Sequence, residues 1–533
     1  MKVPPVGNMR REISSPPAAR GLAAVSAGLA AAAATWFWWS HVSGWLGFSI
    51  ALVAATVADM IWAARTFVPM PHLILFTATL QYALAPWASN FYPSLYPEYQ
   101  IPDLDRYFLY IGPALAATAL GFLASMAGLR LKPRAPDTEP PPPRLLLELD
   151  ILLWGGLAVD YLAPNASEGL AFVFVLLAGL RFVGAIGWMI TEAPGWKWRM
   201  GALLMHEVYT ATLIGMFHDL VLWCFSLLAI FVFLRNLSRF TLVGGLFGLV
   251  VAVFILQDTK LALRRSIWNE SAEVVVFGRP VTFSDWSRPF VSGLCLMDSA
   301  TKLLRGGFTD ESIGNSVTRF NQGWIIDRVM AHMPNDEPFA RGETLWAAVN
   351  ATLLPRFLAP DKVRIDGKMN MERFAAHSLG GGTSMNLGFA GEMYANFGLW
   401  GGAVGCGFYA LALGLFFRGA AALSRRSAFW WAFAVYSGHW ALKAETDVAG
   451  VMNYVFKATL VLLAVTWVMP SLRAELKGQR SAPKSRGHLP RGKWIGFRRR
   501  RALDRVDADS NANPNLNPAA TGEGSGTPGN AGA

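Results

Sequence analysis

Twelve apolar blocks, each close to the length of a membrane-spanning helix, most constrain what this chain can fold into. A helix needs about 20 mainly apolar residues to cross the hydrocarbon core of a bilayer. The pattern therefore predicts an all-α integral membrane protein with about twelve transmembrane helices. The blocks lie near 21–39, 43–64, 70–88, 107–127, 146–163, 169–190, 200–217, 219–234, 240–257, 396–417, 428–443 and 451–469.

The composition argues against a soluble protein. Hydrophobic residues make up 53% of the chain and charged residues 16%, whereas a soluble domain carries about 25% charged residues. A soluble chain this apolar would expose large apolar patches. Many of the 21 tryptophans stand at block ends, as Trp36, Trp196 and Trp400 do. That position is typical of the aromatic belt at a membrane interface.

The net charge of +11 does not indicate nucleic-acid binding, because the excess lies in short loops and in the C-terminal tail. Such a distribution is expected of loops that orient a membrane protein. Two of the three cysteines, Cys224 and Cys406, lie in apolar blocks, so no disulfide framework is predicted. The chain has no C-x-x-C or H-E-x-x-H spacing. We therefore expect neither a metal site nor a cofactor.

Loop charge predicts the topology. The basic N-terminus resembles that of a signal peptide, but the apolar run 21–39 is long and has no clear cleavage site, so it is interpreted as the first membrane helix. We split 200–234 at His218-Asp219, because two spans there place every short basic cluster on one side and the acidic loop 89–105 on the other. A re-entrant hairpin is the alternative for 200–234. Both termini are then expected in the cytoplasm.

The same reasoning divides the chain into five parts. The loop between the ninth and tenth helices has about 125 residues, far more than an ordinary connection. Its amphipathic segments predict a folded, mainly helical extracytoplasmic subdomain. The parts are a cytoplasmic segment 1–20, a first bundle of about nine helices 21–257, the loop subdomain 258–383, a group of about three helices 384–469, and a basic, disordered tail 470–533.

Polar residues at the start of the tenth predicted helix are the main candidates for function. Glu392, Tyr394 and Asn396 stand where the chain is expected to re-enter the bilayer, and an ionisable group at that depth is a functional candidate because it is costly. The alternative for Glu392 is an interfacial residue paired with an arginine. Four glycines in the same block form small-xxx-small pairs, which predicts that the helix packs closely on a neighbour. They are Gly398, Gly401, Gly402 and Gly405.

The stretch 391–398 reads G-E-x-Y-x-N-F-G, and the loop 355–362 before it reads P-R-x-x-x-P-D-K. Both motifs resemble those of the oligosaccharide repeat-unit polymerases, the Wzy-type O-antigen and exopolysaccharide polymerases. The resemblance covers mainly 257–410, and the first half of the chain agrees only in hydropathy.

Two further patterns are similar to that family. Arg356 and Gly367 match an R-x10-G spacing, which is weakly specific because both residues are common. Gln257, Lys260 and Arg264 form Q-x-x-K-x-x-x-R at the outer end of the ninth predicted helix. Lys260 and Arg264 are four residues apart and so share one helical face.

The resemblance implies glycosyl transfer from a polyprenyl-pyrophosphate-linked oligosaccharide to a glycan hydroxyl, at the outer face of a bacterial inner membrane. The anionic leaving group needs fixed cations, and the acceptor hydroxyl needs a base. The catalytic candidates are Glu392 as first base, His377 as second base and Arg356 as cation. The candidates for pyrophosphate or glycan binding are Lys260, Arg264, Arg319, Lys362, Arg364, Tyr394, Asn396 and Arg181.

The expected partners are the lipid-linked oligosaccharide, the bilayer, a chain-length regulator and a flippase, and nucleic acid is not among them. Arg181 is a candidate for lipid-phosphate contact, since a lone arginine in a span costs roughly 2.5–3.5 kcal/mol and must face protein, water or phosphate. Internal pairing is its alternative. For the loop arginines the alternative is a salt bridge, because acidic residues are about as abundant there.

Two other functions remain open. An O-antigen ligase-like enzyme would share the outer loop and the cationic chemistry but would transfer finished glycan to a different acceptor. A transporter or flippase of lipid-linked glycans would need a charged cavity spread over many helices, with internal repeats. The motif at 391–398 favours the polymerase over the ligase. The gathering of polar residues in one outer segment, without an internal repeat, favours chemistry over transport.

Overall fold

The computed structural model describes residues 41–64, 66–93, 97–129, 140–163, 168–214, 217–235, 239–268, 273–277, 279–282, 288–306, 310–353, 367–380 and 385–479. Within these ranges helices dominate and the strands form a single two-stranded sheet, so the chain is an all-α membrane protein. Seven described helices are long and apolar enough to cross a membrane. The predicted block 21–39 lies outside the described residues.

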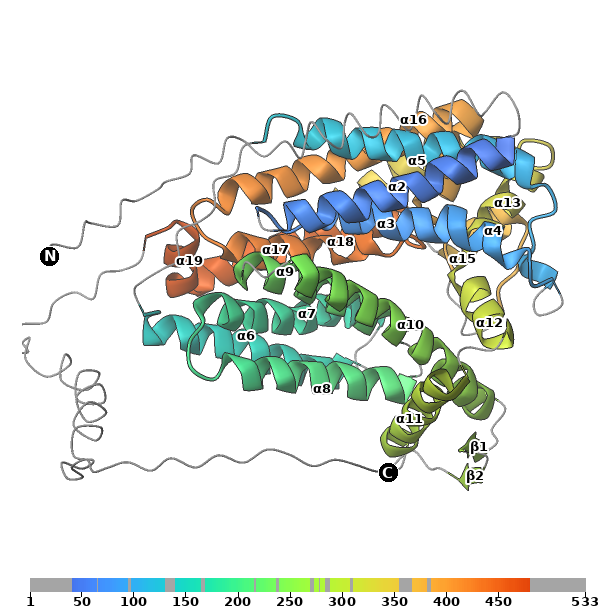
Figure 1. Cartoon of the computed structure of the whole chain (residues 1–533). Coiled ribbons are helices and arrows are strands. Elements are labelled where there is room, and N and C mark those ends of the chain that lie inside the picture. The colour runs from blue at the N-terminus through green and yellow to red at the C-terminus, as the bar shows by residue number, and fades with distance from the viewer. Residues whose placement is uncertain are drawn as a thin grey trace, which may run out of the picture. The chain divides into compact units, whose positions relative to one another are not determined.

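Each apolar block from residue 43 onward coincides with a helix or a run of helices, and the long helices run roughly along one direction (Figure 1). These elements are α2 (His41–Ala63), α3 (Met70–Thr79) with the π-helical turn η1 (Leu80–Leu84) and α4 (Ala85–Ser89), α5 (Leu104–Met126), α6 (Pro143–Leu162), α7 (Glu168–Thr191), α8 (Trp196–Ile214), α9 (His218–Arg235), α10 (Arg239–Trp268), α16 (Gly388–Leu423), α17 (Phe429–Gly438) with the 3₁₀ turn η4 (His439–Leu442), and α18 (Val448–Val468).

Proline explains the π-helical turn between α3 and α4. Pro86 has no N–H, so the carbonyl of Tyr82 cannot accept the usual bond from the residue four positions later. The buried hydroxyl of Tyr107 in α5 donates to that carbonyl instead. The helix thus stays continuous while one of its backbone groups fastens it to α5.

Helices α5 and α16 pack along much of their length, and glycine permits their close approach. A Cβ at Gly121 would lie 2.2 Å from the carbonyl oxygen of Gly407, and one at Gly414 would lie 1.9 Å from Oγ of Ser125. The close neighbour predicted for this helix is therefore present. Among the glycines of the predicted pairs, Gly402 also lies against α5, where a Cβ would be 3.1 Å from the ring of Tyr110. Gly401 and Gly405 instead accommodate side chains of α16 itself, with a Cβ reaching 2.7 Å from Phe397 and Met393, respectively.

The segment between α10 and α16 is mainly helical and lies toward one end of the long helices (Figure 1). It also contains a β-hairpin, which the helical expectation did not include. The valines of the hairpin pack with Val291 and Cys295 of α11 and with Phe217 next to α9. The elements are β1 (Glu273–Val276), β2 (Arg279–Thr282), α11 (Arg288–Gly306), α12 (Asp310–Phe320), α13 (Gly323–His332), α14 (Glu343–Leu353) and α15 (Gly367–Ala375). A single 3₁₀ turn, η2 (Pro97–Tyr99), precedes α5.

Two predicted part boundaries fall inside folded structure. Helix α10 runs without a break across the boundary after residue 257. The tail was expected to begin at residue 470, yet α19 (Pro470–Leu476) follows α18 directly. The buried carboxylate of Glu148 in α6 accepts the amides of Ser471 and Leu472 at 3.1 and 2.7 Å, which stabilises the first turn of α19. The described residues up to Gln479 form one compact unit.

Candidate functional site

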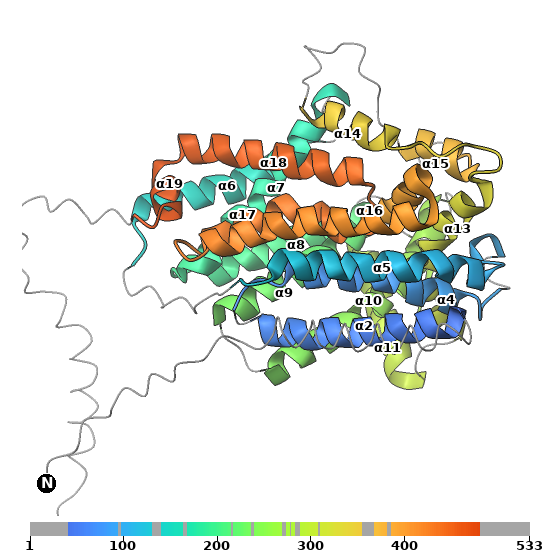
Figure 2. The same cartoon turned by 90° about the horizontal axis from the view of Figure 1, so that it is seen from above.

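Glu392 occupies the first turns of α16 and is fully buried. Its Oε1 accepts from the hydroxyl of Thr344 in α14 at 2.7 Å, and its Oε2 accepts from the amide of Val448 at the start of α18 at 2.7 Å. A carboxylate near a helix N-terminus is favourable because the first amides of a helix lack intrahelical partners. One side chain therefore ties three helices together, which Figure 2 shows with α14, α16 and α18 as neighbours.

Asn396 extends this network by one helical turn. Its Nδ2 donates to Thr344 Oγ1 at 2.7 Å and to the carbonyl of Glu392 at 2.8 Å, while its Oδ1 accepts from the amide of Gly342 at 2.9 Å. We call Thr344, Glu392, Asn396 and Val448 the Glu392 clamp. The clamp satisfies every polar group of the Asn396 side chain, and it fixes the loop before α14 against α16.

A kink in α16 supplies further contacts for the same loop. Gly398 has φ 69° and ψ −159°, a conformation that favours glycine. The kink frees carbonyls that would otherwise accept bonds within the helix. Those of Ala395 and Asn396 accept instead from the amides of Ala340 and Arg341, both at 3.0 Å. A Cβ on Gly398 would lie 3.0 Å from the ring of Phe339, so the loop packs directly on the kink.

A second group of polar residues connects α5 with α13 and the residues after α15. Arg106 donates to Asp327 at 3.0 Å, and Arg328 lies 5.4 Å from the ring of Trp324. The imidazole of His377 meets the same tryptophan edge-on, with 5.3 Å between ring centroids. We call Arg106, Trp324, Asp327, Arg328 and His377 the His377 cluster.

Burial and the nearby charge of Arg328 lower the pKa of His377 below its ordinary 6.5. The histidine is therefore neutral near pH 7 and can accept a proton. Burial raises the pKa of Asp327, although Arg106 opposes the shift. The Arg106 guanidinium also lies within electrostatic reach of the Tyr394 hydroxyl. The His377 cluster thus combines a neutral base with two guanidinium groups.

The predicted site residues fall into several places. Arg356, Lys362 and Arg364 lie outside the described residues. Lys260 and Arg264 belong to α10, where the side chain of Arg264 is not described, and the half-buried Arg319 lies near the end of α12. The structure therefore brings together Glu392 and Asn396 in the Glu392 clamp. It places His377 in a second cluster, and the buried ring of Tyr394 packs against Tyr110 and Phe339.

The side chain of Arg181 contacts protein. Protein, water and lipid phosphate were the three surroundings expected for an arginine at this position. Its Nε donates to Glu207 of α8 at 2.6 Å and its Nη1 donates to Asp160 of α6 at 3.1 Å. His206 of α8 contacts the other oxygen of Asp160 at 2.8 Å. The guanidinium of Arg181 is thus committed to two carboxylates between helices α6, α7 and α8.

Thr344 could not be identified from the sequence alone, because its two partners in the clamp lie 48 and 52 residues away along the chain. Arg106 was also missed, although a cation in the first turn of an apolar block is a recognisable signal. Arg328 and Asp327 carry no such signal, since they stand in an ordinary amphipathic helix.

Among the described residues no group of three or more histidine, cysteine or acidic side chains could hold a metal ion. Cys224, Cys295 and Cys406 are free thiols. Comparison with known proteins gives no match: no family model, no curated protein and no solved structure matches the chain.

Proposed function

We propose that this chain is a membrane glycosyltransferase that polymerises lipid-linked oligosaccharide repeat units, of the O-antigen or exopolysaccharide kind. One observation carries the proposal. The residues of the G-E-x-Y-x-N-F-G motif join the membrane helices α16 and α18 to α14 and its preceding loop. The part of the sequence that resembles the polymerases therefore holds α14 and the loop before it on α16 and α18.

The geometry favours a division of roles within this site. Both oxygens of Glu392 already accept hydrogen bonds, so its proposed role is to position α14 and α18. His377 is half-buried and neutral, so it is the proposed base. The base would take the proton of the acceptor hydroxyl as that oxygen bonds to the anomeric carbon.

The bond from the anomeric carbon to the pyrophosphate oxygen breaks in the same step, and the lipid pyrophosphate leaves as an anion. Arg106 and Arg328 in the His377 cluster, together with Arg356 of the motif at 355–362, would stabilise that charge through their guanidinium groups. No metal or cofactor has a step in this scheme.

The proposed topology has twelve spans, with both termini in the cytoplasm of a bacterium and the α11–α15 region outside its inner membrane. Beyond the seven long apolar helices, it assigns spans to the α3–α4 run, α6, α8, α17 and residues 21–39. Reporter fusions after Ala300 and after Arg480 test it. We expect an extracytoplasmic signal at the first and a cytoplasmic one at the second, and a cytoplasmic signal after Ala300 would overturn the mechanism.

The catalytic assignment is tested by polymer length in a producing strain. His377→Ala and Arg356→Ala should each abolish long-chain polymer while single repeat units accumulate on the lipid carrier. His332→Ala is the matched control, because His332 at the end of α13 pairs with the exposed carboxylate of Asp336. Normal polymer length in the His377 variant would exclude His377 as the base.

Two alternatives remain. A ligase-like enzyme would leave polymer length unchanged when inactivated and would instead stop transfer to a different acceptor. A transporter or flippase is favoured by one observation, the charged network of Arg181, Glu207 and Asp160 buried among α6, α7 and α8. Loss of a flippase would trap repeat units on the cytoplasmic leaflet, which labelling of intact cells distinguishes.

A further inference from the structure

Helix α11 turns large apolar side chains outward and polar side chains toward the protein. Phe290, Met297 and Leu304 are 70%, 61% and 87% exposed. They stand seven residues apart, so they share one face of the helix. Asp298 and Ser299 are buried on its other side. A helix that faces water normally has the opposite arrangement, with its polar residues outward.

The outward face of α11 carries no charge along its length. We call Phe290, Met297 and Leu304 the α11 apolar face. The positions three and four residues after Phe290 and after Met297 lie on the same side of the helix, and all four are uncharged. They are Gly293, Leu294, Ala300 and Thr301. A contiguous apolar surface of this kind marks an interaction site.

The contact between α11 and α10 places this face at the level where a membrane span ends. The apolar window of α10 runs from Val243 to Lys260. Near the end of that window Asp258 accepts from the hydroxyl of Ser299 at 2.7 Å, and the hydroxyl of Thr259 donates to the same serine oxygen at 3.2 Å. Ser299 belongs to the middle part of α11, so α11 crosses α10 where the span reaches the headgroup region.

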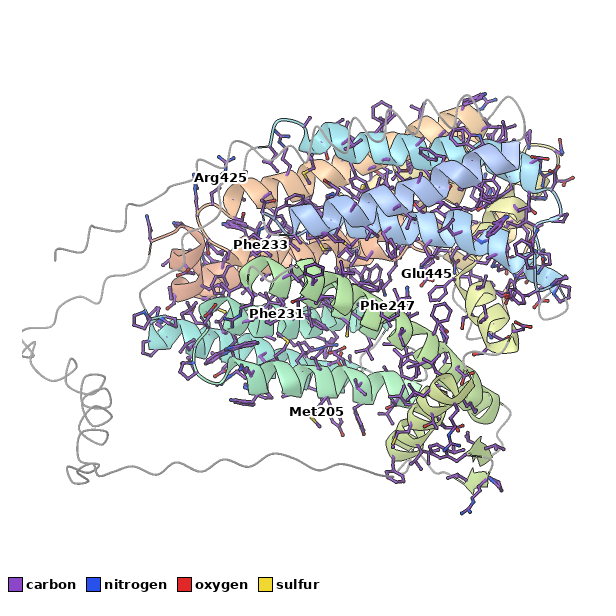
Figure 3. The ribbon with its side chains drawn as sticks, viewed as in Figure 1. Met205, Phe231, Phe233, Phe247, Arg425 and Glu445 are labelled. Carbon is purple, nitrogen blue, oxygen red and sulfur yellow. The ribbon has the colours of Figure 1, made fainter. Side chains whose placement is uncertain are left out.

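The helix on which α11 packs lies at the edge of the bundle. In its apolar window 6% of the residues are buried, the lowest share among the seven described helices that can cross a membrane. Figure 3 shows Phe247 on the part of α10 that precedes its contact with α11, and this side chain is 69% exposed. Figure 1 shows α11 across the C-terminal part of α10, at an angle to the long helices. Lipid around the span therefore reaches α11.

The composition of α11 suits the membrane surface better than the membrane interior. Its 19 residues include Arg288, Asp298, Lys302 and Arg305, and it is not one of the described helices that are apolar enough to cross a membrane. Three basic residues against one acidic residue favour contact with anionic headgroup phosphates. A helix with an apolar face and a basic polar side lies in the plane of the interface, with its apolar face about 5–10 Å deep.

We propose that α11 is an interfacial helix, which lies along the membrane surface where α10 ends and inserts the α11 apolar face among the lipid chains. Lys302 pairs with Asp298 at 2.9 Å and is still 63% exposed. Its ammonium and the exposed guanidinium of Arg305 extend toward the headgroup phosphates. The proposal requires α10 to span the bilayer and is independent of the proposed glycosyl transfer.

Spin labels on single cysteines test where the α11 apolar face lies, in the full chain in lipid nanodiscs. The background is Cys224→Ser, in which the remaining thiols, Cys295 and Cys406, are buried. The label is placed by Phe290→Cys, Met297→Cys and Leu304→Cys, each of which replaces an exposed side chain. Dissolved oxygen concentrates among lipid chains, whereas a neutral nickel chelate stays in water, so the two reagents report the surroundings of each label.

Two exposed positions serve as controls. Phe247→Cys reports the lipid-facing side of α10, and Met369→Cys reports an exposed methionine, 56% exposed, on the polar helix α15. We expect oxygen to relax the labels more strongly than the nickel chelate on the α11 apolar face, as at Phe247, with the reverse at Met369. If the label at Phe247 also reports water, the span assignment of α10 and the proposal both fail.

Other occupants of the face give different results. Stronger relaxation by the nickel chelate at all three positions of the α11 apolar face would place it in water and overturn the proposal. Weak relaxation by both reagents would show that protein covers the face, which also overturns it. Dipolar broadening between labels would then identify that protein as a second copy of this chain.

Met297→Ser gives a second measurement that needs no label. The side chain is largely exposed within the protein, so in water its replacement should leave hydrogen exchange of α11 within about twofold. If the side chain lies in lipid, we expect exchange of α11 to become about tenfold faster, because an apolar anchor is lost. Met369→Ser is the matched control and should leave exchange of α15 unchanged. Unchanged exchange of α11 in Met297→Ser would contradict the proposal.

Discussion

The buried carboxylate of Glu392 allows a quantitative test of how α16 holds its neighbours. Glu392→Ala removes the acceptor for the hydroxyl of Thr344 and for the amide of Val448, at a position that is 0% exposed. Each donor left unpaired in the interior costs about 1–3 kcal/mol. The substitution should therefore lower the free energy of unfolding by about 2–6 kcal/mol, before any loss from the cavity that it creates.

Glu392→Gln distinguishes a positioning role from a catalytic one. The amide keeps one acceptor oxygen but turns its NH₂ group toward the other donor, so one bond is lost at about 1–3 kcal/mol. A positioning role predicts that helix protection and polymer formation fall together. It also predicts that Thr344→Val reproduces part of the loss. A catalytic base would instead lose all activity in Glu392→Gln while α14 and α18 stay protected.

Hydrogen exchange in lipid nanodiscs measures this local opening directly. A loss of about 2 kcal/mol corresponds to roughly 30-fold faster exchange, which we expect in α14 and in the first turn of α18. Glu372→Gln is the control, since Glu372 is an exposed carboxylate that accepts only a 3.3 Å bond from Ser378 among the bonds described for it. Unchanged exchange of both segments in Glu392→Ala would refute the reasoning.

Three further predictions concern stability. Gly398→Ala should cost about 1–3 kcal/mol in a thermal unfolding assay, because φ is 69° and the new Cβ would lie 3.0 Å from the ring of Phe339. Arg181→Gln should cost about 3–5 kcal/mol by the same assay and lower the yield, because it leaves two carboxylates unpaired between helices. The hydrogen bond from Arg373 lowers the pKa of Glu343 from its ordinary 4.5, so the pair stabilises the fold above about pH 4.5 and this stabilisation is lost as the pH falls through the lowered pKa. Arg373→Gln should remove this loss of stability on acidification, which a pH series of unfolding midpoints measures. The change in the free energy of unfolding should be less than about 1 kcal/mol, because Glu343 is 60% exposed.

The helices of the bundle could be predicted because each is determined within its own segment. An apolar block in a membrane must satisfy its backbone groups internally, so hydropathy alone locates a helix. The split at His218 follows the same logic, and α8 ends at Ile214 while α9 begins at His218. The hairpin β1–β2 was missed because four-residue strands give a weak signal beside long helices. The tail was predicted to begin too early because the contact of Glu148 with α19 is not visible in the local sequence. Glu148 belongs to a helix more than 300 residues earlier in the chain, and it stabilises α19.

The same distinction, between what one segment determines and what depends on distant segments, applies to the candidate site. The sequence by itself determined that the chain is a helical membrane protein, and it singled out Glu392 and Asn396, because a polar motif at the opening of an apolar helix is visible in one segment. Only the tertiary structure decided that both oxygens of Glu392 are occupied, that Arg106 meets Asp327 221 residues away, and that Arg181 pairs with carboxylates of two other helices. The reason is physical: hydropathy acts within a segment, whereas the partner of a buried polar group depends on which helices pack together and at what rotation.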